Sequence, residues 1–291
     1  MTRLCLLLPF ALMACEASGP ANEADSDPSV LEVSPPYAEW TVHPSPFLRI
    51  GAVDGTVEVE LSQVVYAGRL TDGRHVIVDG ASKEVRWFDD AGAFQFKAGG
   101  DGEGPGEFSR INAAVVTPQD SIVLYDGRNQ RLTWFGPRGT LARTVRAELQ
   151  GSVALLPLAD SRVWVVEERI VTNIGGSEYN YARDSIAIMV APDSSGRLDP
   201  FLERPGREAA TWVRYVGGAP TATQQMELPF ARSTLTGAVG DHVALMENGQ
   251  PEVAFFDQAG ALRHAARRTD LSAQELTSSM RDQYVRSSVC L

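Results

Sequence analysis

Hydrophobic and polar positions alternate with a period of two over much of the chain between residues 47 and 268. This period is typical of short β-strands with one buried face. Four β-branched runs stand out, and each follows a turn that contains aspartate: Val76-Ile-Val78 after Asp72, Ile122-Val-Leu124 after Asp120, Val163-Trp-Val-Val166 after Asp160, and Val243-Ala-Leu245 after Asp241. The pattern therefore predicts an all-β region in which one arrangement of strands and turns recurs.

A second mark follows each of these runs, namely an aromatic or apolar pair with a polar turn and a glycine behind it. It occurs at Trp87-Phe88 before Gly92, Trp134-Phe135 before Gly139, Met189-Val190 before Gly196, and Phe255-Phe256 before Gly260. Glycine suits a tight hairpin turn because it adopts positive φ without a Cβ clash. The first two copies are about 47 residues apart, which fits the period of a four-stranded propeller blade, about 40–50 residues. The repeat predicts a β-propeller of four-stranded antiparallel blades, about four of them in this chain. A generic antiparallel sandwich with glycine turns is the alternative.

The second repeat resembles an NHL repeat. Gly102-Glu-Gly-Pro-Gly-Glu-Phe108 is similar to the inter-blade loop of that family, and Asp126, Asn129 and Arg131 match its D-x-x-N-x-R pattern. The first repeat keeps only the aspartate, Asp79. The resemblance implies that these residues organise the turn between the second and third strands, with Arg131 paired to Asp126. The chain as a whole resembles six-bladed propeller lipoproteins of bacteria.

The N-terminus predicts export and a lipid anchor. Arg3 is followed by the apolar run from Leu4 to Met13 and then by Cys15. This run is too short to span a bilayer, which takes about 20 residues as a helix, so residues 1–14 are predicted to be a signal peptide. Leu12-Met-Ala-Cys15 resembles a bacterial lipobox, and Cys15 is therefore the predicted lipidation site. The expected localisation is the bacterial cell envelope, facing the periplasm or the exterior. An ordinary secretory signal with a chance cysteine is the alternative.

Residues 15–36 are rich in acidic and small residues and proline, so we expect a flexible tether between the anchor and the propeller at residues 37–268. The net charge of −11 argues against a nucleic-acid partner. It also argues against contact with anionic lipid, so the expected membrane contact is the lipid anchor alone.

The strand pattern stops after Arg268. Residues 269–286 predict a short helix, because Ser272 and Glu275 can form a capping box and Leu276, Met280 and Tyr284 recur on one face. Phe47-Leu-Arg-Ile50 is expected to be the strand that closes the last blade. We therefore expect residues 269–291 to be a helix and a truncated C-terminus of a six-bladed propeller. A complete four-bladed propeller is the competing interpretation.

The sequence contains no recognisable catalytic motif. The four histidines, at positions 43, 75, 242 and 264, are far apart along the chain. The glycine-rich stretch from Gly99 to Gly106 is not followed by a helix that could bind phosphate, so it is interpreted as a connection between blades. We therefore predict no catalytic residue, no metal and no cofactor.

Binding residues are predicted on the face that carries the connections between blades and the turns between second and third strands. They are Arg110, Asn112, Arg128, Asn129 and Gln130, with Tyr179, Asn180 and Tyr181 in a long loop expected from Glu167 to Arg183. The predicted function is a non-catalytic binding or scaffold module for a protein, peptide or glycan. Resemblance to propeller lyases and lactone hydrolases implies a metal-dependent enzyme as the alternative, but the expected inner strands offer few metal-ligating side chains. A non-functional fragment is the third interpretation.

Overall fold

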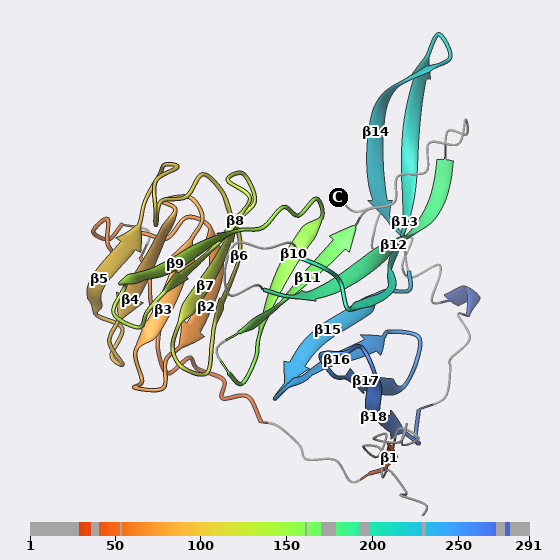
Figure 1. Ribbon diagram of the computed structural model, residues 1–291, viewed down its shortest axis with the longest axis horizontal. Helices are drawn as coiled ribbons and strands as arrows, with labels where there is room; N and C mark the ends of the chain where they lie inside the picture. Colours follow the sequence, from red (N-terminus) through yellow and green to blue (C-terminus); the bar gives the residue numbers. More distant parts are fainter. Residues whose placement is uncertain are drawn as a thin grey trace, which may run out of the picture.

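The computed structural model describes residues 29–35, 41–52, 54–160, 162–169, 179–191, 198–228, 231–271 and 277–279. Within these residues eighteen strands form four sheets, which stand next to one another in chain order (Figure 1). Ser278 and Ser279 have helical backbone, and the rest of the predicted helix lies largely outside the described residues, as do the signal peptide and Cys15.

The first two sheets are regular four-stranded meanders, each with its strands in chain order. Blade 1 contains β2 (Val64–Arg69), β3 (His75–Asp79), β4 (Glu84–Phe88) and β5 (Phe94–Gly99). Blade 2 contains β6 (Ile111–Val116), β7 (Ile122–Asp126), β8 (Arg131–Phe135) and β9 (Leu141–Arg146). Their boundaries follow the predicted alternation and turns closely.

Blades 3 and 4 each have a fifth strand. Blade 3 contains β10 (Ser152–Pro157), β11 (Val163–Arg169), β12 (Tyr179–Val190), β13 (Leu202–Val216) and β14 (Ala219–Glu227). The far ends of β13 and β14 project from the rest of the molecule as a hairpin at the top of Figure 1. Blade 4 contains β15 (Thr234–Val239), β16 (His242–Glu247), β17 (Glu252–Phe256), β18 (Leu262–Arg268) and, next to β18, β1 (Ser29–Val33).

The first strands of successive sheets contact one another, β2 with β6, β6 with β10 and β10 with β15. This is the arrangement of the inner strands of a propeller, and the predicted fold is confirmed. The hydrophobic core lies between adjacent blades. Trp134 packs in the cluster shared by blades 2 and 3, while its neighbour Phe135 packs in the cluster shared by blades 1 and 2. Successive side chains of a strand point to opposite faces, so this aromatic pair supplies one ring to each neighbouring blade.

The strand expected at Phe47–Ile50 is not formed. Leu48 and Ile50 instead lie against the turn at Gly92 in blade 1, outside any strand. The outermost strand of blade 4 is β1, which pairs parallel to β18 from Ser29 opposite His264 to Val33 opposite Arg268. β1 lies inside the range expected to be tether. Its five residues are too few to outweigh the acidic and proline-rich composition around them, so their apolar positions gave too weak a signal.

Candidate functional site

A buried carboxylate at the end of β7 organises the start of blade 2. Asp126 is fully buried and accepts hydrogen bonds from the backbone N–H groups of Ser109 at 2.8 Å and Arg110 at 3.1 Å. It also accepts hydrogen bonds from the backbone N–H groups of Arg128 and Asn129, both at 3.0 Å. One side chain thereby fixes the chain segment that leads into β6 and the turn that leaves β7.

Arg131 does not pair with Asp126, so that expectation is wrong. Its guanidinium donates instead to three backbone carbonyls of the glycine-rich connection, at 2.7–2.9 Å: those of Glu103, Gly104 and Glu107. Asp126 is already occupied by N–H donors, whereas these carbonyls have no strand partner and need a donor. Asn129 supports the same connection, because its side-chain amide donates to Asp126 at 2.9 Å and to the carbonyl of Gly102 at 3.2 Å.

Equivalent acceptors stand at the end of the second strand in the other blades. In blade 1, Asp79 accepts from the N–H groups of Gln63 at 2.9 Å and Ala81 at 3.1 Å. Burial raises the pKa of Asp79, but hydrogen bonds led by those from Gln63 and Ala81 outweigh it and hold the pKa below its ordinary value. In blade 3, Glu167 accepts from the N–H groups at 150 and 151, and in blade 4 Asn248 accepts from that at 233. Sequence reasoning missed Glu167 and Asn248. A search for any polar acceptor side chain near the end of each second strand could have found them.

Blade 1 also has a counterpart of Arg131 that the pattern did not reveal. The guanidinium of Arg86 donates to the carbonyls of Glu60 at 2.6 Å and Glu58 at 3.3 Å, in the segment that leads into β2. Arg86 lies two residues further along its strand than the matching position, which is occupied by Glu84. Glu84 accepts a hydrogen bond from the Nε of Arg86 at 3.0 Å. Glu84 thus holds the guanidinium of Arg86, which makes the contacts that Arg131 makes in blade 2.

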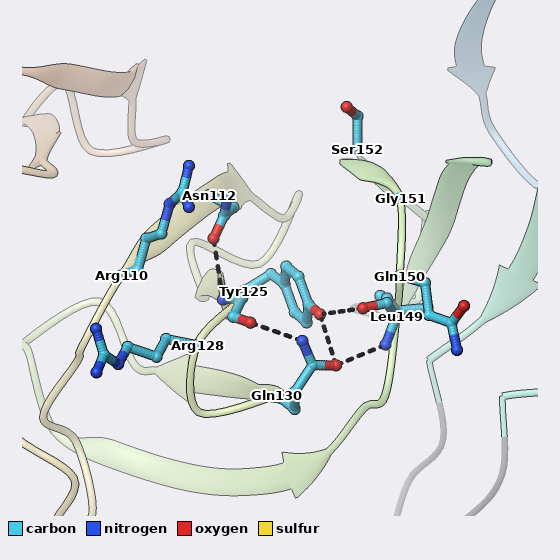
Figure 2. Close-up of a pocket in the computed structure, with 10 residues that line it drawn as sticks. Arg110, Asn112, Tyr125, Arg128, Gln130, Leu149, Gln150, Gly151 and Ser152 are labelled. Carbon is cyan, nitrogen blue, oxygen red and sulfur yellow. Dashed lines mark hydrogen bonds between the residues drawn. The ribbon is translucent and has the colours of Figure 1, made fainter. Parts of the chain in front are cut away.

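A cleft of about 610 Å³ lies between blades 2 and 3 on the face that carries these connections (Figure 2). It is lined by Arg110, Asn112, Tyr125, Gly127, Arg128, Gln130, Leu149, Gln150, Gly151 and Ser152. The side-chain oxygen of Gln130 accepts from the N–H of Leu149 at 2.8 Å and from the hydroxyl of Tyr125 at 3.2 Å, while its amide nitrogen donates to the carbonyl of Gly127 at 2.6 Å. The floor of the cleft is therefore a closed hydrogen-bond network.

The backbone conformation of Gln130 indicates that this floor is firmly held. Gln130 has φ of 50°, a left-handed conformation that a non-glycine residue keeps only when its surroundings impose it. Burial raises the pKa of Tyr125 to about 12, so its hydroxyl stays neutral and acts as a donor to Gln130.

The walls of the cleft carry exposed polar side chains. In Figure 2, Arg110 and Arg128 lie on one side of the Tyr125–Gln130 network, and Gln150 and Ser152 lie on the other. Among the described residues, neither guanidinium has a hydrogen-bond or ion-pair partner.

Asn112 forms part of the same wall. Its side-chain oxygen accepts from the N–H of Gly127 at 3.0 Å, which leaves the amide hydrogens free to face a ligand. Glycine at position 127 leaves room for this contact, since a Cβ there would displace the end of the Asn112 side chain.

A second cleft of about 370 Å³ lies between blades 1 and 2. It is lined by Gln63, Val64, Val65, Gly80, Ser109, Arg110, Ile111 and Asn112. Arg110 and Asn112 thus border both clefts, which together cover the starts of the inner strands β2, β6 and β10. The candidate site is this polar surface across three blades.

Four predicted binding residues, Arg110, Asn112, Arg128 and Gln130, lie together in the larger cleft. Asn129 does not line it, because its side chain turns inward to Asp126 and Gly102. The loop expected from Glu167 to Arg183 is also different, since β11 continues to Arg169 and β12 begins at Tyr179. Tyr179, Asn180 and Tyr181 pair in register with Trp212, Thr211 and Ala210 of β13, so they are strand residues and not a loop tip. Sequence reasoning missed Tyr125 and residues 149–152. Residues 149–152 could have been found from their position in the connection between blades 2 and 3.

No group of three or more histidine, cysteine, aspartate or glutamate side chains suited to a metal is present in the part of the chain that the structure describes. Within the same residues, no helix has the length and apolar character needed to cross a bilayer.

Comparisons with known proteins concern the fold. Residues 56–157 match a family described as a 6-bladed β-propeller, and no curated protein matches the sequence. A protein of Bacteroides fragilis described as exported is 15% identical with a TM-score of 0.47; the alignment covers 83% of this chain and 61% of that one, so this chain spans less than two thirds of its length.

Two further structures are less similar. Virginiamycin B lyase of Staphylococcus aureus, crystallised as an inactive variant with quinupristin, is 12% identical over 75% of each chain with a TM-score of 0.35. A chain of the nidogen/laminin complex is 8% identical over 72% of this chain and 86% of its own, with a TM-score of 0.38. The chain is a β-propeller protein, and its residues from before β2 to β10 match the 6-bladed β-propeller family.

Proposed function

We propose that this chain is a non-catalytic binding module of a bacterial cell envelope, which presents the connected clefts over blades 1 to 3 to a protein, peptide or glycan. The observation that carries the proposal is the pair of guanidinium groups, on Arg110 and Arg128, which have no partner in the described part of the chain and lie above a firmly held floor. A floor held in place before binding loses little freedom when a ligand arrives, which favours affinity.

The chemistry of the clefts supports binding more than catalysis. The residues described as lining them include no histidine, carboxylate or cysteine. They therefore offer no general base near neutral pH and no usual metal ligand. The Tyr125 hydroxyl, with its pKa raised to about 12, is a poor base as well as a poor acid at neutral pH.

The proposed localisation in the cell envelope rests on the sequence. Arg3, the apolar run up to Met13 and the lipobox-like segment ending at Cys15 support export and lipid attachment. The acidic chain would then meet the membrane only through this anchor. Incorporation of labelled palmitate into the protein in the native host tests this, and we expect the label to disappear in Cys15→Ser. Equal labelling of Cys15→Ser would contradict it.

The binding proposal is tested by screening the purified full chain against arrays of peptides and glycans. Ser152→Trp places a bulky ring in the larger cleft at an exposed position whose hydroxyl has no partner among the described residues. Arg138→Trp, in the turn between β8 and β9 on the opposite face, is the matched control. We expect a ligand that binds the unaltered chain and Arg138→Trp but not Ser152→Trp, with all three melting alike. Failure to retain any ligand, equal binding by Ser152→Trp, or recovery of a chemically altered ligand would each overturn the proposal.

A further inference from the structure

Among the residues that the structure describes, the guanidinium groups of Arg110 and Arg128 have no partner, although the protein is acidic. The chain has 37 acidic and 26 basic residues, so carboxylates are in excess. Many other arginines form ion pairs: Arg74, Arg146, Arg162, Arg232, Arg263 and Arg267. Of the described arginines that are likewise unpaired, positions 49, 138 and 214 lie outside both clefts. Arg110 and Arg128 share one cleft, and no described residue occupies their charges, so both can meet an anion.

A single residue positions both of them. Asp126 accepts the backbone N–H of Arg110 at 3.1 Å and that of Arg128 at 3.0 Å, so both guanidinium groups start from fixed backbone positions. The carboxylate itself is buried and surrounded by N–H donors, so it forms no ion pair with either group. Guanidinium groups bind carboxylates well because their N–H donors match the two carboxylate oxygens.

The remaining lining groups favour a peptide as the carrier of those carboxylates. The amide of Gln150 and the hydroxyl of Ser152 have no side-chain partner among the described residues, and they lie across the cleft from the arginines (Figure 2). Such groups, together with the free amide hydrogens of Asn112, can pair with the N–H and C=O groups of a peptide backbone. An exposed aromatic ring would favour a glycan, whereas Tyr125, the aromatic residue among those described as lining this cleft, is only 2% exposed.

The shape of the surface indicates an extended ligand. The two clefts lie on either side of Arg110 and Asn112, and they cover the starts of three successive inner strands. We propose that this surface binds an extended acidic peptide segment, whose carboxylates meet Arg110 and Arg128 while its backbone meets Asn112, Gln150 and Ser152. The inference rests on the proposed function and names its ligand class.

The test measures binding of fluorescein-labelled hexaglutamate to the full chain, with labelled hexaglutamine and a trigalacturonate as comparison probes. Arg110→Gln and Arg128→Gln are each expected to weaken hexaglutamate binding about tenfold. Loss of one hydrogen-bonded charge pair lowers an affinity by roughly that factor. Arg138→Gln removes the same charge from the opposite face and is expected to leave binding unchanged. Added salt should weaken binding further, because it screens exposed charges.

Several results would overturn the inference. Equal binding of hexaglutamine would show that charge is not recognised, and preference for trigalacturonate would assign the carboxylates to a glycan. An equal loss in Arg138→Gln would indicate unspecific attraction. If no acidic probe binds but an array ligand still depends on the cleft, the peptide inference fails while the proposed function stands. If no ligand of any kind binds there, both fail.

Discussion

At the scale of single residues, each blade is held by an acceptor side chain where its second strand ends. Backbone N–H groups that lead into the inner strand have no partner in the sheet, and a buried donor left unpaired is costly. Aspartate supplies the acceptor in blades 1 and 2, the longer Glu167 in blade 3 and the neutral Asn248 in blade 4. The geometry selects an acceptor atom at one place, and several residue types can deliver it.

Removing that acceptor in blade 2 should destabilise the fold. We expect Asp126→Ala to lower the free energy of unfolding by about 3 kcal/mol, because several partly buried N–H donors lose their acceptor. Asp72→Ala is the control, since its carboxylate is half-exposed and pairs with Arg74 at the surface. It should cost about 1 kcal/mol or less. Guanidinium denaturation followed by tryptophan fluorescence measures both, and equal costs would contradict the assignment.

Sequence reasoning at this scale identified the turn role of Asp126 and the face on which Arg110 and Arg128 lie, whereas binding by these two arginines stays a prediction. It failed where a long side chain does the same work from another position. Arg86 reaches the connection before β2 from two residues further along, and Glu167 reaches its amides with an extra methylene. Asn129 was assigned both to the turn and to binding, and its contacts are those of the turn. A pattern of letters cannot show how far side chains reach.

At the scale of elements, the strands of blades 1 and 2 follow directly from alternation and turn residues, because their partners are close in sequence. β1 could not be found in that way. Its five residues lie in a polar segment and become a strand only against β18, which is far away in sequence. The start of β12, from Tyr179 to Arg183, was interpreted as part of a loop for the same reason. The tyrosines at its edge are held by pairing with β13 and not by local preference.

The role of β1 can be tested by breaking it. Neighbouring N–H groups of a strand point to opposite sides, so Val30→Pro combined with Leu31→Pro must remove a donor that faces β18. We expect faster amide hydrogen exchange across Leu262–Arg268. Proline at both Thr41 and Val42, which are exposed and outside any strand, is the matched control. Unchanged exchange in β18 would show that β1 does not protect it.

At the scale of the whole molecule, many carboxylates are held in their charged form by the fold. Burial raises the pKa of Glu84, but hydrogen bonds from Lys97 and Arg86 outweigh it and lower the pKa below its ordinary value. The pKa of Asp257 is lowered in the same way by the amide of Ala261 and by Arg263, against the effect of burial. The pKa of Asp79 is likewise lowered by hydrogen bonds that outweigh the effect of burial. The unfolded chain therefore binds protons more readily than the folded chain in acid.

This difference predicts acid destabilisation. A carboxylate whose folded pKa is depressed contributes stability above its ordinary pKa, and the contribution is lost as the pH falls through the folded value. We expect the melting temperature to fall as the pH is lowered from about 7 to below about 4. Asp79→Asn should be less stable at neutral pH and show a shallower dependence. A melting temperature that stays constant or rises on acidification would contradict this account.

The pairing of β1 with β18 also has a consequence for the time course of synthesis. Ser29 and His264, which share a hydrogen bond of 2.8 Å, are 235 positions apart. At about 5–20 residues per second, a ribosome makes the second residue on the order of tens of seconds after the first. Blades 1 to 3 are complete before then, whereas blade 4 must wait. Throughout that interval residues 29–33 lack the partner against which they form a strand, and the exposed edges of the earlier blades are open to pairing with them.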